Sequence, residues 1–158
     1  MIQRIQTLYL LISVILLGII TSGLSFWNID TGVGSSGTFN VFGYDWFSLD
    51  GSKVSPNSIP LFVATSIISL LQILAIFYFK NLKSQLKIVN LSLVIYVLTL
   101  VFVALIPVFG KNWEMGSDFK FIPGVSFYLL IAGFIFAFLA NRGIKKDKNL
   151  LDSLNRLR

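Results

Sequence analysis

The sequence contains no cysteine and no histidine among its 158 residues, and the two absences remove a wide range of chemistry. Disulfides, zinc sites of the usual kind, haem ligation by histidine or cysteine, and iron–sulfur clusters are all excluded. A cysteine or histidine nucleophile or general base is excluded for the same reason. We therefore expect no cofactor, and only oxygen ligands remain for a metal.

Charge is also scarce, and apolar residues are abundant. Only 13% of the residues are charged and 55% are hydrophobic, and the mean hydropathy is +0.80. A soluble domain carries about 25% charged residues. Because the apolar residues occur in long blocks, the composition indicates a membrane protein rather than a large aqueous core.

Four uncharged apolar runs predict four membrane spans, at residues 7–26, 59–79, 88–109 and 121–140. At about 1.5 Å per helical residue, twenty residues cross a hydrocarbon core of about 30 Å. The small residues near position 22 leave a cleaved signal peptide as the alternative for the first run, but that run is longer than a usual signal-peptide core. The expected fold class is an all-α, four-transmembrane-helix bundle.

The basic residues predict how this bundle is oriented. The connection 80–87 carries three lysines, and ten of the thirteen basic residues lie in 1–6, 80–87 and 141–158. Five of the seven acidic residues lie in the opposite connections, 27–58 and 110–120. Loops rich in lysine and arginine stay in the cytoplasm, so both termini are predicted to be cytoplasmic. This also accounts for the net charge of +6 without a nucleic-acid partner.

The two outer connections are predicted to form a small extracytoplasmic cap. Asp50-Gly51 lies between the short segments 46–49 and 52–54, which is typical of a type I′ β-hairpin. Residues 41–46 and 108–113 share the pattern Val-Phe-Gly-x-x-Trp. The shared pattern suggests that the two outer segments pack together, in one small sheet.

The tail 141–158 is predicted to form a short amphipathic cytoplasmic helix, because its apolar residues recur at helical spacing. We expect it to lie on anionic lipid or to dock a cytoplasmic protein. The alternative is a topology anchor with a frayed end. The candidate docking face comprises Ile144, Leu150, Leu151, Leu154 and Leu157, edged by Lys145, Lys146, Lys148, Arg156 and Arg158.

No charged residue lies inside the four predicted spans, whereas proton relays and coupled transporters usually place one there. Thr65, Ser69 and Gln72 share one face of the second span, and Asn90 lies near the inner end of the third. We expect these side chains to form interhelical hydrogen bonds, and a polar permeation path is the alternative. Gly18/Ser22 and Gly133/Ala137 allow close helix approach, within one bundle or in a homo-oligomer.

The outer carboxylates are candidates for metal binding or acid–base catalysis, but their spacing matches no EF-hand and indicates no enclosing cleft. They are Asp30, Asp45, Asp50, Glu114 and Asp118. Residues 32–37 match the dinucleotide pattern G-x-G-x-x-G, yet they follow a membrane span rather than a buried strand. We therefore predict a flexible linker here and no catalytic, metal or cofactor-binding residue.

Both ends of the sequence resemble one known family. Residues 1–7, and residues 146–158 with Asp147, Leu150, Ser153 and the closing Arg156-Leu157-Arg158, are similar to an uncharacterised bacterial family of four-span membrane proteins, domain of unknown function 4293. This family is found mainly in Bacteroidetes, and the chain departs from its pattern at Lys148 and Asn155. The resemblance implies a multi-pass protein of the bacterial inner membrane and no known activity.

Three classes of function follow from these observations. The first is a non-enzymatic scaffold or accessory protein with a cytoplasmic tail that binds a partner or lipid. The second is a small-solute channel or transporter that uses Thr65, Ser69, Gln72 and Asn90. The third is an enzyme at the outer face that uses aspartate or glutamate, which would require two carboxylates to converge in a cleft.

Overall fold

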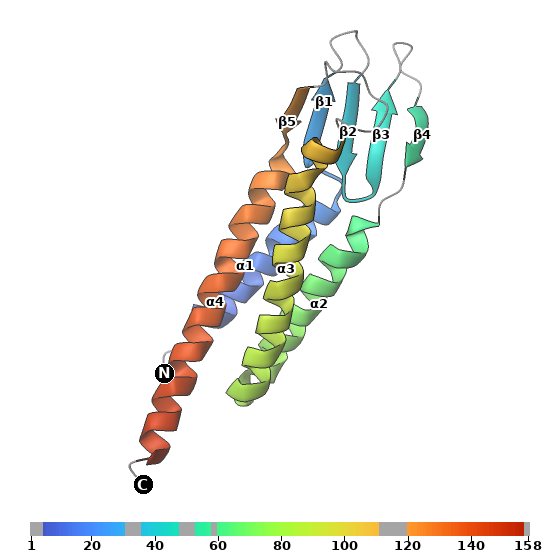
Figure 1. The fold of residues 1–158 in the computed structure, drawn as a ribbon. Helices are drawn as coiled ribbons and strands as arrows, with labels where there is room; N and C mark the ends of the chain where they lie inside the picture. The colour runs from blue at the N-terminus through green and yellow to red at the C-terminus, as the bar shows by residue number, and fades with distance from the viewer. Residues whose placement is uncertain (1–4, 31–35, 48–52, 58–59, 111–119, 157–158) are drawn as a thin grey trace.

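The computed structural model describes residues 5–30, 36–47, 53–57, 60–110 and 120–156, and these residues are mostly helical, as predicted (Figure 1). The α-helices are α1 (Ile5–Thr21), α2 (Leu61–Phe77), α3 (Leu82–Gly110) and α4 (Val125–Arg156), with a 3₁₀ turn η1 (Tyr78–Lys80) after α2. The strands are β1 (Trp27–Asp30), β2 (Ser36–Asn40), β3 (Gly43–Phe47), β4 (Lys53–Asn57) and β5 (Lys120–Pro123).

Three helical segments are long and apolar enough to cross a membrane: Leu61–Lys80, Leu82–Phe109 and Val125–Ser153. The helix α1 is also apolar but has only 17 residues. Large apolar side chains cover the outside of the bundle, among them Leu70, Leu98 and Phe102. Such a surface suits lipid tails and would be unusual on a soluble monomer. Together these features indicate a membrane protein.

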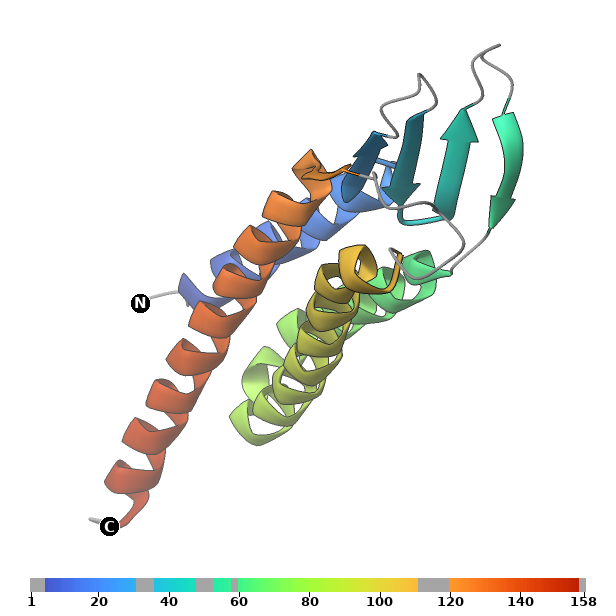
Figure 2. The ribbon, with the colours of Figure 1, turned by 45° about the horizontal axis from the view of Figure 1, so that its top comes forward.

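The four helices form one bundle in which α1 lies beside α4 and α2 lies beside α3 (Figure 2). Contacts of α1 with α2 and of α3 with α4 join these two pairs of helices into the bundle. Core positions in α1 alternate in steps of three and four, at Gln6, Leu10, Ser13, Leu17 and Ile20. The same spacing recurs in α2, from Leu61 to Ala75, and in α3, from Gln85 to Ile106. A repeat of about 3.5 residues is typical of helices packed at a shallow left-handed angle.

The sheet lies at one end of the bundle, and both chain termini and the α2–α3 turn lie at the other (Figure 1). These ends are called the sheet end and the terminal end below. The strand order is β4-β3-β2-β1-β5, and all neighbouring strands are antiparallel. The predicted hairpin is confirmed between β3 and β4, where Trp46 lies opposite Val54. Its Asp50-Gly51 turn lies outside the described residues.

The cap is larger than the predicted hairpin, because it has five strands and the last of them precedes α4. Pairing of β1 with β5 places Ile29 opposite Phe121, so the segment before α4 joins the same sheet; of the predicted outer connection 110–120, Lys120 belongs to β5 and residues 111–119 lie outside the described residues. The Val-Phe-Gly-x-x-Trp pattern is not a common structural unit, however. Val41 and Phe42 form the turn between β2 and β3, whereas Val108 and Phe109 belong to the last turn of α3.

Asn40 and Gly43 explain the tight turn between β2 and β3. The Asn40 Oδ1 atom accepts hydrogen bonds from the amides of Phe42 (2.8 Å) and Gly43 (3.1 Å). Its Nδ2 atom donates to Asp45 Oδ2 at 2.8 Å. Gly43 has a φ of 138°, which favours glycine. An asparagine that holds its own turn is a common way to start a hairpin.

The core of the sheet and the core of the bundle are continuous. Phe26, Phe39 and Tyr44 belong to the same buried cluster as Leu61 and Val103 of the helices. The Phe39 and Tyr44 rings lie 4.6 Å apart at their centroids. The sheet is therefore fixed to the helices by apolar packing and does not form an independent domain.

The junctions between helices and strands are held by backbone hydrogen bonds. The amide of Gly124 donates to Phe26 O at 2.8 Å, and that of Ser126 donates to Ser25 O at 3.1 Å. A Cβ atom on Gly124 would lie 2.3 Å from the Ser25 carbonyl oxygen. Position 124 therefore requires glycine, because no side chain fits between the start of α4 and the segment that joins α1 to β1.

Two predicted boundaries at the sheet end are wrong. The helix α1 ends at Thr21 rather than at residue 26, because Gly23 takes a φ of 97° and terminates the helix. The fourth apolar run begins as strand β5, and α4 starts only at Val125. In both places apolar residues that looked like membrane helix instead build the sheet.

The predicted inner turn at 80–87 is also wrong. α3 already begins at Leu82, so two of the three lysines lie on its first turns. Asn81 caps this helix: its Oδ1 atom accepts from the Ser84 amide at 3.3 Å, and its carbonyl accepts from the Gln85 amide at 2.9 Å. At the other end of the chain, α4 runs without a break through the predicted domain boundary at residue 140.

Burial raises the pKa of the Tyr44 phenol to about 12. The ordinary value is about 10, so the folded state holds this proton more tightly than the unfolded chain does. Its contribution to stability is complete below about pH 10 and is lost as the pH rises toward 12. We expect the thermal unfolding midpoint to fall over this range, and Tyr44→Phe to make the fall shallower. An unchanged profile in Tyr44→Phe would contradict the assignment.

Candidate functional site

The C-terminal part of α4 projects beyond the α2–α3 turn at the terminal end (Figure 1). Residues 141–156 of this helix are called the α4 extension here. Residues 141–158 contain six basic residues and two acidic ones. The sequence predicted a separate amphipathic helix, whereas the structure shows the continuation of the apolar helix that precedes it.

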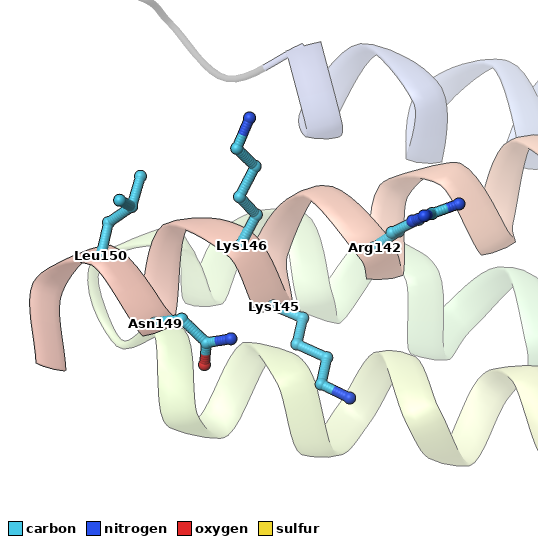
Figure 3. A pocket seen from close by; sticks show the side chains of 5 residues that line it. All are labelled: Arg142, Lys145, Lys146, Asn149 and Leu150. Carbon is cyan, nitrogen blue, oxygen red and sulfur yellow. The ribbon is translucent and has the colours of Figure 1, made fainter. Parts of the chain in front are cut away.

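An open depression of about 420 Å³ lies along the α4 extension. Its lining residues recur at helical spacing along the extension: Arg142, Lys145, Lys146, Asn149 and Leu150. Lys146 and Leu150 point to one side of the helix, and Lys145 and Asn149 point to the other, toward the α2–α3 pair (Figure 3). The side chains therefore border a shallow strip rather than enclose a small molecule. Such a strip suits contact with another surface.

The predicted docking face is only partly assembled in the structure. Leu150 and Leu151 are 55% and 51% exposed, and Lys145 and Lys146 are also exposed. Lys148 is half-buried. Leu154 and Arg156 continue the helix, but their side chains, and the whole of Leu157 and Arg158, lie outside the described residues.

Ile144 departs from the predicted face. It is fully buried and packs in one cluster with Leu10, Ala75, Val89 and Ala140. The reason is the seven-residue spacing of the bundle core, which places position 144 on the same inward seam as Leu130 and Ala137. Ile144 therefore anchors the α4 extension to the bundle and is unavailable to a partner.

A polar contact holds the α4 extension against the first turn of α1. Gln6, which is 7% exposed, donates from Nε2 to Asp147 Oδ2. A Cβ atom on Gly143 would lie 2.6 Å from Gln6 Cγ, so glycine at this position allows the two helices to approach. These contacts and buried Ile144 fix the direction of the extension along the bundle axis.

The structure does not gather the predicted intramembrane polar face. Thr65 is buried and its hydroxyl donates to Phe62 O at 3.1 Å, whereas half-buried Ser69 donates to Ser66 O at 2.8 Å. Gln72 is fully buried, and neither polar atom of its amide has a hydrogen-bond partner. Asn90 is exposed and accepts a hydrogen bond from Asn141. Only Thr65 and Gln72 face the core.

Sequence reasoning missed a longer polar pattern inside the bundle. The buried polar residues of the first three helices recur every seven residues: Gln6 and Ser13 in α1, Thr65 and Gln72 in α2, and Gln85, Ser92 and Thr99 in α3. In α4, Ser126 is followed seven residues later by Gly133, which is also buried. This core position is polar or small over most of each helix, until Ile20 in α1 and Ile106 in α3 occupy it near the sheet end. The signal was a seven-residue periodicity of polar residues within apolar runs.

Gly133 and Ala137 pack inside this bundle, as the intramolecular interpretation predicts, whereas Gly18 and Ser22 of the other predicted pair are exposed. The Ser13 hydroxyl donates to Gly133 O at 3.0 Å and joins α1 to α4. The Tyr96 hydroxyl points at the same place, because a Cβ atom on Gly133 would lie 2.3 Å from it. Gly133 thus makes room for a buried tyrosine.

The described residues offer no group of three histidine, cysteine, aspartate or glutamate side chains that could hold a metal. Asp45 accepts a hydrogen bond from Asn40 in the β2–β3 turn. Asp50, Glu114 and Asp118 lie outside the described residues, as do residues 32–35 of the glycine-rich pattern. Gly37, the last glycine of that pattern, lies in strand β2 under the ring of Trp46.

A family model described as a domain of unknown function, DUF4293, matches residues 2–157. The chain belongs to this family. A comparison with curated proteins found no match. The resemblance noted at both ends of the sequence is thus confirmed for the family, and it extends over nearly the whole chain. The family description gives no activity, so any function must be argued from the structure itself.

Proposed function

We propose that this DUF4293 protein is a non-enzymatic accessory protein of the bacterial inner membrane that docks an acidic cytoplasmic protein on its α4 extension. It has four spans and two cytoplasmic termini. The orientation is supported by the position of the basic residues: Lys80, Lys83 and Lys87 accompany the basic α4 extension at the terminal end.

The fourth span in this proposal is α1. Its 17 residues extend about 26 Å, close to the lower limit of about 17 residues for a membrane-spanning helix. Leu8, Leu11 and Ile15 are exposed on its outer side. The helix runs beside α4, from Gln6 near the terminal end to the start of the sheet. These features favour a helix that crosses the membrane with the other three.

The direction of the α4 extension favours a protein partner over lipid. Leu150 lies eight residues beyond Arg142, a rise of about 12 Å along the helix. The headgroup region on each side of a bilayer is only about 5–8 Å thick. If Arg142 marks the edge of the hydrocarbon, Leu150 and Leu151 lie in water. Helices that bind lipid surfaces lie in the membrane plane instead.

Charge determines which protein partner fits. Residues 141–158 carry six basic residues and two acidic ones, so a second copy of the extension would be repelled. An acidic amphipathic helix would pair with the basic edge and cover the exposed Leu150 and Leu151. The uninterrupted α4, with exposed leucines and lysines beyond the bundle, is the observation that carries the proposal.

Photo-crosslinking in intact bacterial membranes tests this function. With a photoreactive residue at position 150 of the full chain, we expect a covalent adduct with a cytoplasmic protein. Lys145→Glu with Lys146→Glu should reduce the adduct at least about tenfold, because it opposes an acidic partner with like charge. Lys83→Glu with Lys87→Glu makes the same charge change at the same end of the bundle and should leave the adduct unchanged.

Three other results would contradict the proposal. An adduct with lipid alone would show a membrane-surface role for the extension. An adduct with a second copy of the chain would show self-association. A protein adduct that is insensitive to the charge reversal at Lys145 and Lys146 would show nonspecific proximity.

A further inference from the structure

Three glutamines surround the apolar cluster near the terminal end of the bundle. This cluster comprises Leu10, Ala75, Val89, Ala140 and Ile144. In the sequence, one glutamine precedes Leu10 by four residues, another precedes Ala75 by three, and the third precedes Val89 by four. Each therefore lies about one helical turn from a member of the cluster, on a different helix. The three are Gln6, Gln72 and Gln85.

These glutamines are buried, and they are incompletely bonded. Gln72 and Gln85 are fully buried, and Gln6 is 7% exposed. Nε2 of Gln6 donates to Asp147, and Nε2 of Gln85 donates to Ala75 O at 3.0 Å, where α2 ends. Among the residues that the structure describes, the Oε1 atoms of all three, and Nε2 of Gln72, have no hydrogen-bond partner. Four polar atoms thus remain unpaired around one cluster.

Polar atoms in this position need partners. These atoms are closed off from bulk solvent, and buried polar groups in native proteins are nearly always paired with protein or ordered water. We propose that the terminal end of the bundle holds an internal hydration site, in which ordered water is bound by Gln6, Gln72 and Gln85. This inference concerns the bundle interior and does not depend on the proposed docking function.

The chemistry of the unpaired atoms fits water. They are three acceptors and one donor, and a buried water typically makes about three hydrogen bonds with both kinds of group. A water can donate to two Oε1 atoms and accept from Nε2 of Gln72. Gln72 and Gln85 are near each other in the bundle, because Gln85 bonds the carbonyl of Ala75, only three residues after Gln72. A bare cation could also meet the three oxygens, so the experiment must separate the two.

Water contact with Gln72 is measured directly by magnetisation transfer from water to side-chain amides, with labelled full-length protein in lipid bilayers. We expect transfer to Gln72 Nε2 despite its complete burial. Exposed Asn149 supplies the reference for a hydrated amide. Absence of transfer to Gln72, with normal transfer to Asn149, would overturn the hydration site.

Gln72→Met gives an independent thermal test, because methionine keeps the length of the side chain and removes both amide atoms. If the site holds water, the unfolding midpoint falls by several degrees, because the bound water loses its hydrogen bonds to the Gln72 amide. A dry site predicts a rise, because two unpaired polar atoms disappear. Thr65→Val is the matched control: its hydroxyl bonds only to carbonyls of its own helix, and the midpoint should hardly move.

Replacing Na⁺ and K⁺ by choline distinguishes water from a bound cation. An unchanged midpoint for the wild-type protein supports water. A fall that Na⁺ or K⁺ reverses would identify a cation site and overturn the proposal. If Gln72→Met fails to insert, the magnetisation transfer on the wild-type chain still decides.

Discussion

Trp27→Phe is expected to destabilise the protein by about 1–3 kcal/mol, because it leaves a buried backbone carbonyl without a partner. Inside α3, the carbonyl of Val103 would normally accept from the amide of residue 107, but that residue is proline and has no N–H. The indole Nε1 of Trp27 donates to Val103 O at 2.9 Å and takes the place of the missing amide. Strand β1 thereby supplies the hydrogen-bond donor that α3 lacks near the sheet end of the bundle.

A double-mutant cycle tests this substitution of one donor for another. Pro107→Ala restores a backbone amide that can bond Val103 O, so Trp27→Phe should cost little in that background. Phenylalanine keeps an aromatic ring against Phe127, whose centroid lies 5.0 Å from that of Trp27. The measurement is the unfolding free energy of all four proteins in one detergent. An equal cost of Trp27→Phe in both backgrounds would mean that ring packing, rather than the hydrogen bond, sets the effect.

The apolar runs predicted the helices well, because membrane helices are recognised from composition over about twenty residues. Their ends were predicted less well, since composition does not distinguish a helix in lipid from a strand in an apolar cap. Phe26 and Phe121 were assigned to spans, and the structure places them beside and within the sheet. The lysines at 83 and 87 were assigned to a turn because charged residues were taken to end a membrane span. A helix can begin outside the hydrocarbon, however, and Asn81 marks the true start of α3.

Contacts between distant segments were the hardest to predict. Strand β5 pairs with β1 across about ninety residues of sequence, and β5 has only four residues. Nothing local to it distinguishes a strand from the first turn of an apolar helix. In the candidate site, the exposed Leu150 and Leu151 follow from the helical spacing of the tail. Burial of Ile144 follows only from extending the bundle's seven-residue spacing past residue 140, which a boundary placed there prevented.

The polar stripe in the core was visible in the sequence, since Gln6/Ser13, Thr65/Gln72 and Gln85/Ser92/Thr99 each repeat every seven residues. Thr65 and Gln72 were singled out from the sequence, but the same seven-residue spacing in the other helices was overlooked. The stripe matters because apolar side chains alone drive little helix association in lipid, where the surroundings are equally apolar. Hydrogen bonds such as that from Ser13 to Gly133 O, together with small residues that allow close approach, therefore fix the register of the bundle.

Gly133→Ala is expected to destabilise the bundle by about 1–3 kcal/mol through overpacking at its centre. The added Cβ atom would lie 2.3 Å from the Tyr96 hydroxyl oxygen, on a fully buried side chain. Tyr96 cannot turn away easily, because its ring packs against Phe134 with centroids 5.8 Å apart. The substitution should therefore push α3 away from α4 and weaken the bond between Ser13 and Gly133 O as well.

Removal of the opposing atom should reverse this effect. Tyr96→Phe deletes the hydroxyl that the new methyl group meets, and that hydroxyl has no partner with hydrogen-bond geometry, although Ser13 is its neighbour. We expect Tyr96→Phe alone to be nearly neutral and to recover most of the stability lost in Gly133→Ala, as measured by reversible unfolding in detergent. Gly18→Ala is the control: no atom lies within 4 Å of the added carbon, and alanine favours a helix by up to about 1 kcal/mol. If Gly133→Ala were as harmless as Gly18→Ala, the close approach of α3 to α4 at Tyr96 would be wrong.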